Sequence, residues 1–293
     1  RCASCASSTP RSDPGRGAMR TVYLGTSDFA AGVLRRLSGG AHRPQLVLTR
    51  PDRPAGRGRR LTAPPVADAA RELGIALDQP EDVNGEAARA RIAQCAPDVL
   101  VVCAFGALVR EPLLSEYEIV NVHPSLLPRW RGAAPIERAI MAGDTRTGVS
   151  IMRLTAGLDS GPVCLQESVE ISPRDSFGTL AARLEALGAA LLVRALDERP
   201  PYVEQDEAQA TYAEKITAAD RTLDPRAPAA ERERIVRALG PHIGARVALD
   251  DGTFLGVLRA RVAPGGAFEP LEVLPAGGRP MPYADYLRGH ATP

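Results

Sequence analysis

The chain has 293 residues, which is long for one compact domain and sufficient for two. Hydrophobic residues make up 44% and the net charge is only +1, so the composition allows a sizeable core and is not typical of a disordered protein. A near-neutral charge argues against general coating of nucleic acid and leaves room for a local basic patch. No apolar stretch approaches the ~20 residues of a membrane span.

The first 18 residues differ from the rest of the chain. Residues 1–18 are polar, rich in Ser, Arg, Pro and Gly, and lack the apolar centre of a secretory signal. We expect them to form a disordered extension, and we expect the protein to be cytoplasmic. Cys2 and Cys5 form a C-x-x-C pair, but no second pair lies near enough to complete a zinc site, so no metal site is predicted. The other cysteines are expected to be small hydrophobes in a reducing compartment: Cys95, Cys103 and Cys164.

The chain opens with an apolar run, Thr21–Leu24, that meets Gly25. Apolar residues then recur at helical spacing from Asp28 to Leu37, and Ser27 is a candidate N-cap. A strand, a glycine turn and a helix are the usual opening of a doubly wound α/β domain. The later predicted elements are a strand at Gln45–Thr49, a helix at Val66–Leu73, strands at Val99–Cys103, Ile119–Val122, Val149–Leu154 and Val163–Ile171, and a helix at Asp175–Leu196. Continuous apolar strands indicate a mostly parallel sheet.

Helical periodicity stops near Arg199, and a polar stretch follows. We expect residues 19–201 to form the first domain, residues 202–221 a linker, and residues 222–293 a second domain. The second domain is predicted to contain a helix at Ala229–Leu239 and strands at Arg246–Leu249, Phe254–Val262 and Leu271–Val273. Short strands broken by Gly and Pro are typical of a small β domain.

The segment from Asn121 to Ile136, N-V-H-P-S-L-L-P-R-W-R-G-A-A-P-I, begins at the carboxyl end of a predicted strand. Open α/β sheets place their ligands at that end. Asn121 and His123 are two residues apart on an extended strand, so they face the same side. An amide and an imidazole that converge on one point can stabilise a developing oxyanion. An isolated N-x-H is common by chance, however, and its polar groups can simply satisfy a loop backbone.

The longer segment resembles the signature of the folate-dependent formyltransferases, and its R-W-R-G-A-A-P-I end is most similar to the methionyl-tRNA branch. Other stretches resemble that family in the same order along the chain. They are its first strand–helix turn (Gly25–Ala30), its tRNA-contacting loop (Arg50–Leu61), its central strand (Val101–Gly106), the loop of its catalytic acid (Gly157–Gly161) and its linker (Thr211–Ile216). The resemblance covers Met19 to about Arg288.

The resemblance implies a Rossmann-like formyltransferase domain followed by a smaller, OB-like domain. It also implies 10-formyltetrahydrofolate as formyl donor, initiator methionyl-tRNA as acceptor, and Asn121, His123 and Asp159 as catalytic residues. The chemistry agrees, because amine attack on a formyl carbon gives a negative oxygen that Asn121 and His123 can hydrogen-bond. Asp159 can hold His123 protonated and relay the amine's proton. On its own, L-D-S-G is ordinary turn sequence, so the role of Asp159 depends on the resemblance.

Two binding regions are also implied by the resemblance. The folate pocket is expected at Ser125, Leu126, Leu127 and Pro128, where backbone groups can pair with the pterin. The alternative for these four residues is a loop anchored by two core leucines.

The second region is Arg50–Leu61, which holds five arginines against one aspartate, a local charge of +4. Its prolines and glycines predict a loop without regular structure. The arginines expected to bind tRNA are Arg53, Arg57, Arg59 and Arg60, of which Arg57 is singled out by the resemblance. The alternative is a solvated basic loop.

The C-terminal region departs from the family. Residues 264–275 are too few for all the strands that the resemblance implies, so a complete barrel is not expected. One alternative function is formyl transfer to another amine, on a nucleotide-linked sugar or glycinamide ribonucleotide. A second is a non-catalytic protein that binds tRNA or folate. The basic loop and the second domain favour methionyl-tRNA, and Asn121, His123 and Asp159 favour an enzyme. A monomer is expected.

Overall fold

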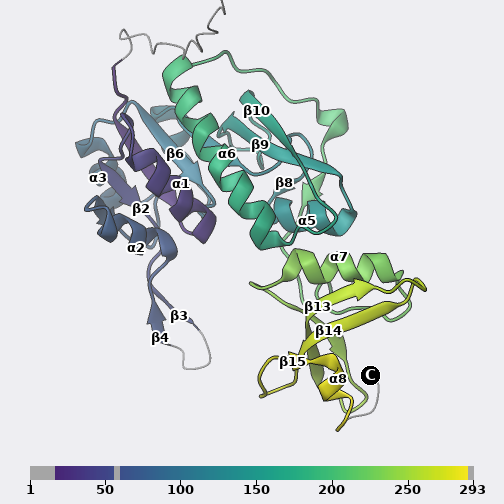
Figure 1. Ribbon diagram of the computed structural model, residues 1–293. Coiled ribbons are helices and arrows are strands. Elements are labelled where there is room, and N and C mark those ends of the chain that lie inside the picture. The colour runs from purple at the N-terminus through teal and green to yellow at the C-terminus, as the bar shows by residue number, and fades with distance from the viewer. Residues whose placement is uncertain (1–16, 56–59, 290–293) are drawn as a thin grey trace, which may run out of the picture.

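The computed structural model describes residues 17–55 and 60–289 (Figure 1). Most of the expected 1–18 extension, Cys2, Cys5, Arg57 and Arg59 therefore lie outside the described residues. A seven-stranded sheet with the order β10-β9-β7-β6-β1-β2-β5 forms the larger part. Its strands are β1 (Thr21–Gly25), β2 (Leu46–Leu48), β5 (Ala76–Asp78), β6 (Val99–Cys103), β7 (Ile119–His123), β9 (Arg146–Arg153) and β10 (Val163–Glu170).

The sheet is mostly parallel, which confirms the predicted fold class. Strands β5, β2, β1, β6 and β7 run parallel to their neighbours. Strands β9 and β10 are antiparallel and complete the edge beside β7. The carboxyl ends of β6 and β7 therefore lie next to each other at one end of the strands, and β9 runs antiparallel to β7.

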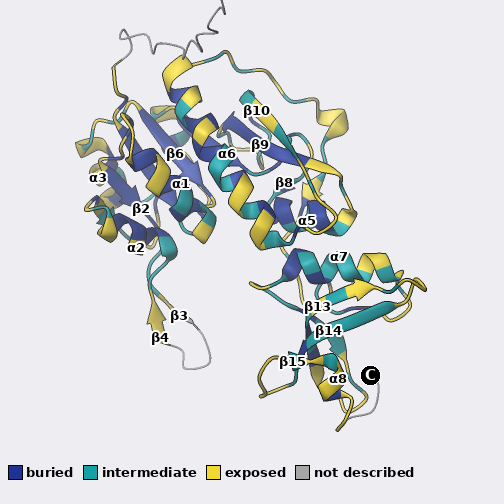
Figure 2. Ribbon diagram, in the orientation of Figure 1, coloured by how far each residue is buried: buried dark blue, intermediate teal, exposed yellow. Residues whose placement is uncertain are grey.

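Alternate residues of the central strands enter two separate cores, as expected for a sheet covered on both faces. Tyr23 and Val101 pack on the face covered by α1 (Asp28–Ser38), α2 (Pro65–Glu72) and α6 (Phe177–Glu198). Leu24 and Leu100 pack on the other face, which α3 (Glu86–Gln94) and α4 (Leu113–Glu116) cover. Figure 2 shows these strands as the most buried part of the molecule. Helix α1 begins as predicted, because the Ser27 side chain accepts a hydrogen bond from the Ala30 amide.

The basic region at Arg50–Leu61 is more regular than the sequence predicts. Strand β3 (Arg53–Ala55) pairs antiparallel with β4 (Arg60–Thr62), and the hairpin extends away from the sheet (Figure 1). The prediction of a loop without regular structure is therefore wrong for these residues. Pro54 is compatible with β3 because the strand has a single partner, and an edge strand tolerates the missing N–H.

The free cysteines of the described residues differ in burial. Cys103 is fully buried in β6, as predicted, while Cys95 and Cys164 are half-buried. Burial raises the pKa of the Cys103 thiol to about 12. Cys103 is therefore a protonated core residue at neutral pH and no nucleophile.

The C-terminal part is β-rich, as predicted. It contains α7 (Ala229–Leu239), a four-stranded antiparallel sheet with the order β12-β13-β14-β15, and α8 (Tyr283–Tyr286). The strands are β12 (Ala245–Ala248), β13 (Phe254–Val262), β14 (Phe268–Leu274) and β15 (Met281–Pro282). In the described residues β12 also forms a parallel bridge from Arg246 to Thr222, while β15 pairs only with β14, so the sheet is not closed into a barrel.

Helix α7 fixes the C-terminal sheet to the larger part. Arg234 donates to the Met141 carbonyl at the end of α5 (Pro135–Ala142), at 3.0 Å. His242 lies 3.0 Å from a Glu137 carboxylate oxygen and stacks on the Phe177 ring at 3.7 Å between centroids. The two parts are thus joined by packed side chains as well as by the chain. Across residues 17–55 and 60–289, no helix has the length and apolar character needed to cross a bilayer.

Candidate active site

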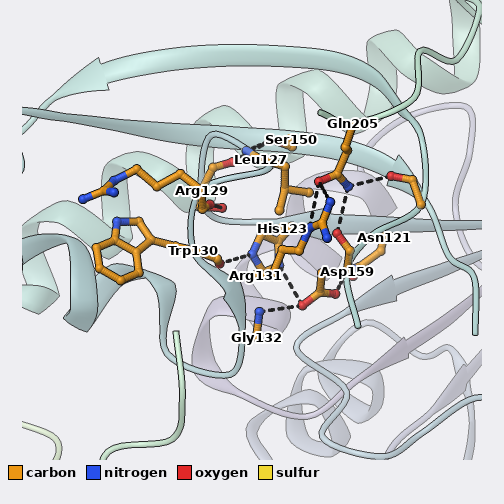
Figure 3. Close-up of polar contacts among 12 residues, drawn as sticks. Asn121, His123, Leu127, Arg129, Trp130, Arg131, Gly132, Ser150, Asp159 and Gln205 are labelled. Atoms are coloured by element: carbon orange, nitrogen blue, oxygen red, sulfur yellow. Dashed lines mark hydrogen bonds and ion pairs between the residues drawn. The ribbon is translucent and has the colours of Figure 1, made fainter. Parts of the chain in front are cut away.

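The three residues expected to be catalytic meet at the carboxyl edge of the large sheet (Figure 3). Asn121 and His123 are buried on β7, and Asp159 lies in the turn after β9 with its side chain 14% exposed. The Asn121 Nδ2 atom is 3.5 Å from Asp159 Oδ1, and His123 Nδ1 is 3.7 Å from Asp159 Oδ2. The alternation of a strand places Asn121 and His123 on one side, as predicted. The turn after β9 brings Asp159 to the same point.

The His123 ring has a defined orientation. Its Nε2 is 2.9 Å from the Trp130 carbonyl oxygen. A carbonyl oxygen can only accept, so Nε2 carries a proton in this arrangement. Nδ1 is left facing the Asp159 carboxylate, and in a protonated ring its N–H points toward that carboxylate. The indole of Trp130 points away from Asp159 and binds Asp144 instead, at 2.7 Å.

Asp159 is held by the backbone of the neighbouring loop. The Gly132 amide donates to Asp159 Oδ2 at 2.8 Å. Asp159 has φ of 45°, in the left-handed region that Asp tolerates better than most residues. One carboxylate oxygen therefore faces His123 and the Gly132 amide, while the other faces Asn121.

The loop predicted to line the folate pocket lies beside His123 but is tied to the sheet. Ser150 on β9 accepts from the Leu127 amide at 3.1 Å and donates to the Ser125 carbonyl at 2.6 Å. Gln166 donates to the Leu127 carbonyl at 2.9 Å, and the Thr211 amide donates to the Pro128 carbonyl at 3.2 Å. The Leu126 carbonyl accepts from the Arg129 amide. These polar contacts anchor the loop, and of the two leucines only Leu127 is buried. The folate contact of Ser125, Leu126, Leu127 and Pro128 stays a prediction.

Two exposed leucines lie in the loops after β6 and β9 and were not predicted. Leu108 is 73% exposed in the loop after β6, and Leu158 is 58% exposed directly before Asp159. The loop after β6 is fixed, because Thr26 donates to the Phe105 carbonyl and Asn84 donates to the Leu108 carbonyl. Large apolar side chains held in solvent beside a polar site can contact a ligand. The only signal for these leucines in the sequence is an apolar residue shortly after a predicted strand. Such residues are also typical of the hydrophobic core, so the signal does not indicate exposure.

Two of the four arginines expected to bind tRNA lie on the hairpin that follows β2. Arg53 and Arg60 are exposed on β3 and β4, with Ala55 paired to Arg60 and Arg53 paired to Thr62. Arg57 and Arg59 lie outside the described residues. In Figure 1 the hairpin and the C-terminal sheet both extend beyond the same end of the larger part.

Three further residues support the site and were missed by the sequence analysis. The Gly132 amide donates to Asp159, and the Arg131 guanidinium donates to the Gln205 side chain (Figure 3). Arg131 is only 1% exposed and forms an ion pair with Glu207. The hydrogen bonds from Arg131 to the Glu207 carboxylate lower the pKa of that carboxyl group. The described residues include no group of three His, Cys, Asp or Glu placed to hold a metal ion.

Comparison with known families defines the class. Residues 19–196 match the family described as formyl transferase. The matched region contains the whole large sheet and the three residues expected to be catalytic, Asn121, His123 and Asp159. The chain thus has the fold of a formyl transferase and belongs to that family.

Relatives narrow the class further. The chain is 43% identical to the methionyl-tRNA formyltransferase of Halorhodospira halophila, over 93% of this chain and 96% of that protein. A solved methionyl-tRNA formyltransferase from Clostridium thermocellum has a TM-score of 0.62 at 12% identity, covering 87% of this chain and 98% of that one. HypX from Aquifex aeolicus, solved with tetrahydrofolic acid, has a TM-score of 0.66 at 16% identity, covering 92% of this chain and 47% of that one. The chain belongs to the methionyl-tRNA formyltransferase family.

Proposed function

We propose that this protein transfers the formyl group of 10-formyltetrahydrofolate to the amino group of initiator methionyl-tRNA. The product, N-formylmethionyl-tRNA, serves translation initiation. The observation that carries the proposal is the convergence of Asn121, His123 and Asp159 at one point of the sheet edge. The near full-length similarity to methionyl-tRNA formyltransferases supports the choice of acceptor. Such a reaction places the protein in the cytoplasm, and we propose that it acts there as a monomer.

The geometry suits attack of an amine on a formyl carbon. The attack produces a tetrahedral intermediate with a negative oxygen, which the Asn121 amide and the His123 ring can hydrogen-bond. His123 donates through Nδ1, since Nε2 is engaged with the Trp130 carbonyl and the 3.7 Å between Nδ1 and Asp159 Oδ2 is longer than a hydrogen bond. The attacking nitrogen gives one proton to Asp159, directly or through water. The bond from the formyl carbon to N10 of the folate then breaks, and N10 takes up the proton that the amine gave to Asp159, which returns the carboxylate to its starting state.

The folate donor has two candidate contacts on the rim of the site. Leu108, in the loop after β6, and Leu158, directly before Asp159, present exposed apolar surface, which suits a flat pterin ring. Ser125, Leu126, Leu127 and Pro128 are the second candidate, and Leu126 and Pro128 are the two of these side chains that are not buried. HypX, which has a similar fold, was solved with tetrahydrofolic acid, in line with a folate donor here.

The parts of the chain divide this work. We assign residues 19–201 to catalysis, residues 202–221 to the connection, and residues 222–293 to tRNA binding. The described sheet of the C-terminal part is open at β15 and does not form a closed barrel. The hairpin at Arg50–Leu61 supplies the larger local positive charge.

A direct assay tests the function. The purified full chain is expected to formylate initiator methionyl-tRNA in the presence of 10-formyltetrahydrofolate, with product detected by mass spectrometry of the released amino acid. An amino sugar linked to a nucleotide and glycinamide ribonucleotide serve as competing acceptors, and neither is expected to react at a comparable rate. Preference for either small amine would replace the proposal with the corresponding alternative. Folate binding without transfer to any acceptor would indicate a non-catalytic protein.

The hairpin arginines are expected to contact phosphates of the tRNA. Changing Arg57→Ala should weaken the use of methionyl-tRNA and make the salt dependence of binding shallower by about one unit of slope, because each neutralised phosphate adds about 0.7–0.9. Folate affinity should not change. The measurement is KM for methionyl-tRNA at several salt concentrations, alongside the Kd for tetrahydrofolate.

A matched control for Arg57→Ala is Arg194→Ala. Arg194 is an exposed arginine of α6 whose ion pairs with Glu167 and Glu198 lie on the surface, where such pairs contribute little. An Arg57→Ala variant that keeps the wild-type salt slope would show that the hairpin is only a solvated basic segment.

A further inference from the structure

Gln205 lies outside the region that matches the formyl transferase family, yet it contacts the turn that carries Asp159. Its amide nitrogen donates to the Asp159 carbonyl at 2.8 Å and to the Gly161 carbonyl at 2.7 Å. Both amide protons are therefore used on the backbone of one turn. Asp159 has positive φ, a conformation that persists when surrounding contacts hold it. Gln205 supplies two such contacts.

The orientation of the Gln205 amide is chemically determined. Its Oε1 accepts from Arg131 Nε at 3.0 Å and from Arg131 Nη2 at 2.9 Å. A guanidinium has no acceptor and a backbone carbonyl has no donor, so the reversed amide would lose all four contacts. Arg131 is itself buried and held by two hydrogen bonds of 2.8 Å to Glu207. It therefore directs Gln205 toward the turn and is too buried to contact a tRNA phosphate.

The same segment also positions the group that binds the Asp159 carboxylate. Strand β11 (Tyr212–Ala213) pairs in parallel with β8 (Arg131–Gly132). The Arg131 amide donates to the Thr211 carbonyl at 2.9 Å, and Thr211 Oγ1 accepts from the Trp130 amide at 2.9 Å. The Gly132 amide is left to donate to Asp159. Gln205 thus holds the turn that presents the carboxylate, and residues 211–213 hold the donor to that carboxylate.

We infer that Gln205, oriented by Arg131, is a positioning residue for Asp159, and that Gln205 and residues 211–213 complete the active site rather than merely link two domains. The inference rests on the proposed function, since it deepens the role of Asp159 in proton transfer. Removing the two donors of Gln205 frees the turn to move, so Asp159 is no longer held against Asn121 and His123. A displacement of about 1 Å at a catalytic group costs on the order of 100-fold in rate.

The variants are Gln205→Ala and Gln205→Glu. The second keeps the size of the side chain and an acceptor for Arg131 but removes both donors to the turn. Each is expected to lower kcat by about 10- to 100-fold with KM for the folate donor unchanged. The matched control is Gln209→Ala, because Gln209 is an exposed glutamine in the same segment whose side-chain amide donates to Asp206, away from the Asp159 turn. It should keep the wild-type kcat.

A double-mutant cycle separates positioning from a general structural effect. In an Asp159→Asn background, Gln205→Glu should cause less than about a threefold further loss in single-turnover rate, because the group it positions is already disabled. A full loss of about 10- to 100-fold in both backgrounds would overturn the inference. An unchanged kcat in Gln205→Glu would also overturn it, while leaving the proposed function standing.

Hydrogen exchange gives a readout that does not depend on activity. Peptides covering residues 154–162 are expected to exchange faster in Gln205→Glu than in the wild type, and at the wild-type rate in Gln209→Ala. Unaltered exchange in Gln205→Glu would overturn the inference. If the wild-type protein formylates none of the acceptors, the proposed function fails, and this exchange experiment still decides whether Gln205 holds the turn.

Discussion

Alanine at His123 or at Asp159 is expected to lower the single-turnover rate of formyl transfer by ~10²–10⁴-fold, the usual loss for an oxyanion or proton-transfer group. His123 contacts the Trp130 carbonyl and faces Asp159, and Asp159 faces both partners on β7. Neither side chain supports the apolar core, so the affinity for tetrahydrofolate should be retained. The measurements are the rate with methionyl-tRNA under single-turnover conditions and the Kd for tetrahydrofolate.

Asp68→Ala is the control for Asp159→Ala. Asp68 is an exposed aspartate of α2 that pairs only weakly with Arg71 three residues away, and its loss should leave the rate unchanged. A His123→Ala or Asp159→Ala variant with a near wild-type rate would remove that residue from the chemistry. Loss of folate affinity in parallel with rate would instead indicate that the residue shapes the donor pocket.

The part of the fold set by local patterns was predictable from the sequence. Continuous apolar runs identified β6 and β7, and the i, i+2 alternation of an extended strand was enough to place Asn121 and His123 on one side. Ser27 was identified as an N-cap from its residue type and position alone. Asp159 is different. It lies 38 residues beyond Asn121, and its turn has no local feature that distinguishes a catalytic acid from an ordinary turn, so the family resemblance was needed.

Other features depend on contacts between distant residues and leave no periodic signal. Strand β5 is three residues long and forms by pairing with β2, so its own sequence indicates little. The hairpin β3–β4 contains proline in one strand, which argues against a strand unless that strand is an edge. Gln205 is a polar residue in a polar stretch, 46 residues beyond Asp159, and only the folded chain reveals its contact. The expected linker therefore contains structure that the pattern could not indicate.

Gly132 illustrates a backbone requirement that the site imposes. Its φ is 116°, and an added Cβ would lie 2.8 Å from the Ala213 carbonyl oxygen. A side chain at this position must therefore either push β8 away from β11 or rotate the Gly132 peptide. Either movement displaces the amide that donates to Asp159 Oδ2. Glycine at this position is therefore needed both for the pairing of β8 with β11 and for the orientation of the Asp159 carboxylate.

The variant Gly132→Ala is expected to lose about 1–3 kcal/mol of unfolding free energy from the strained backbone, and on the order of 100-fold in turnover from the displaced carboxylate. Gly74→Ala is the matched control, because Gly74 also has positive φ, 63°, but a Cβ there would meet no atom within 4 Å. It should be destabilised by the backbone strain alone and keep the wild-type kcat.

Chemical denaturation and single-turnover kinetics on both variants separate the two effects. If Gly132→Ala lost only as much stability as Gly74→Ala and kept its turnover, the Gly132 amide would not be what orients Asp159. If instead its rate fell while tetrahydrofolate affinity was retained, the loss would arise at the step in which Asp159 takes the proton of the attacking amine.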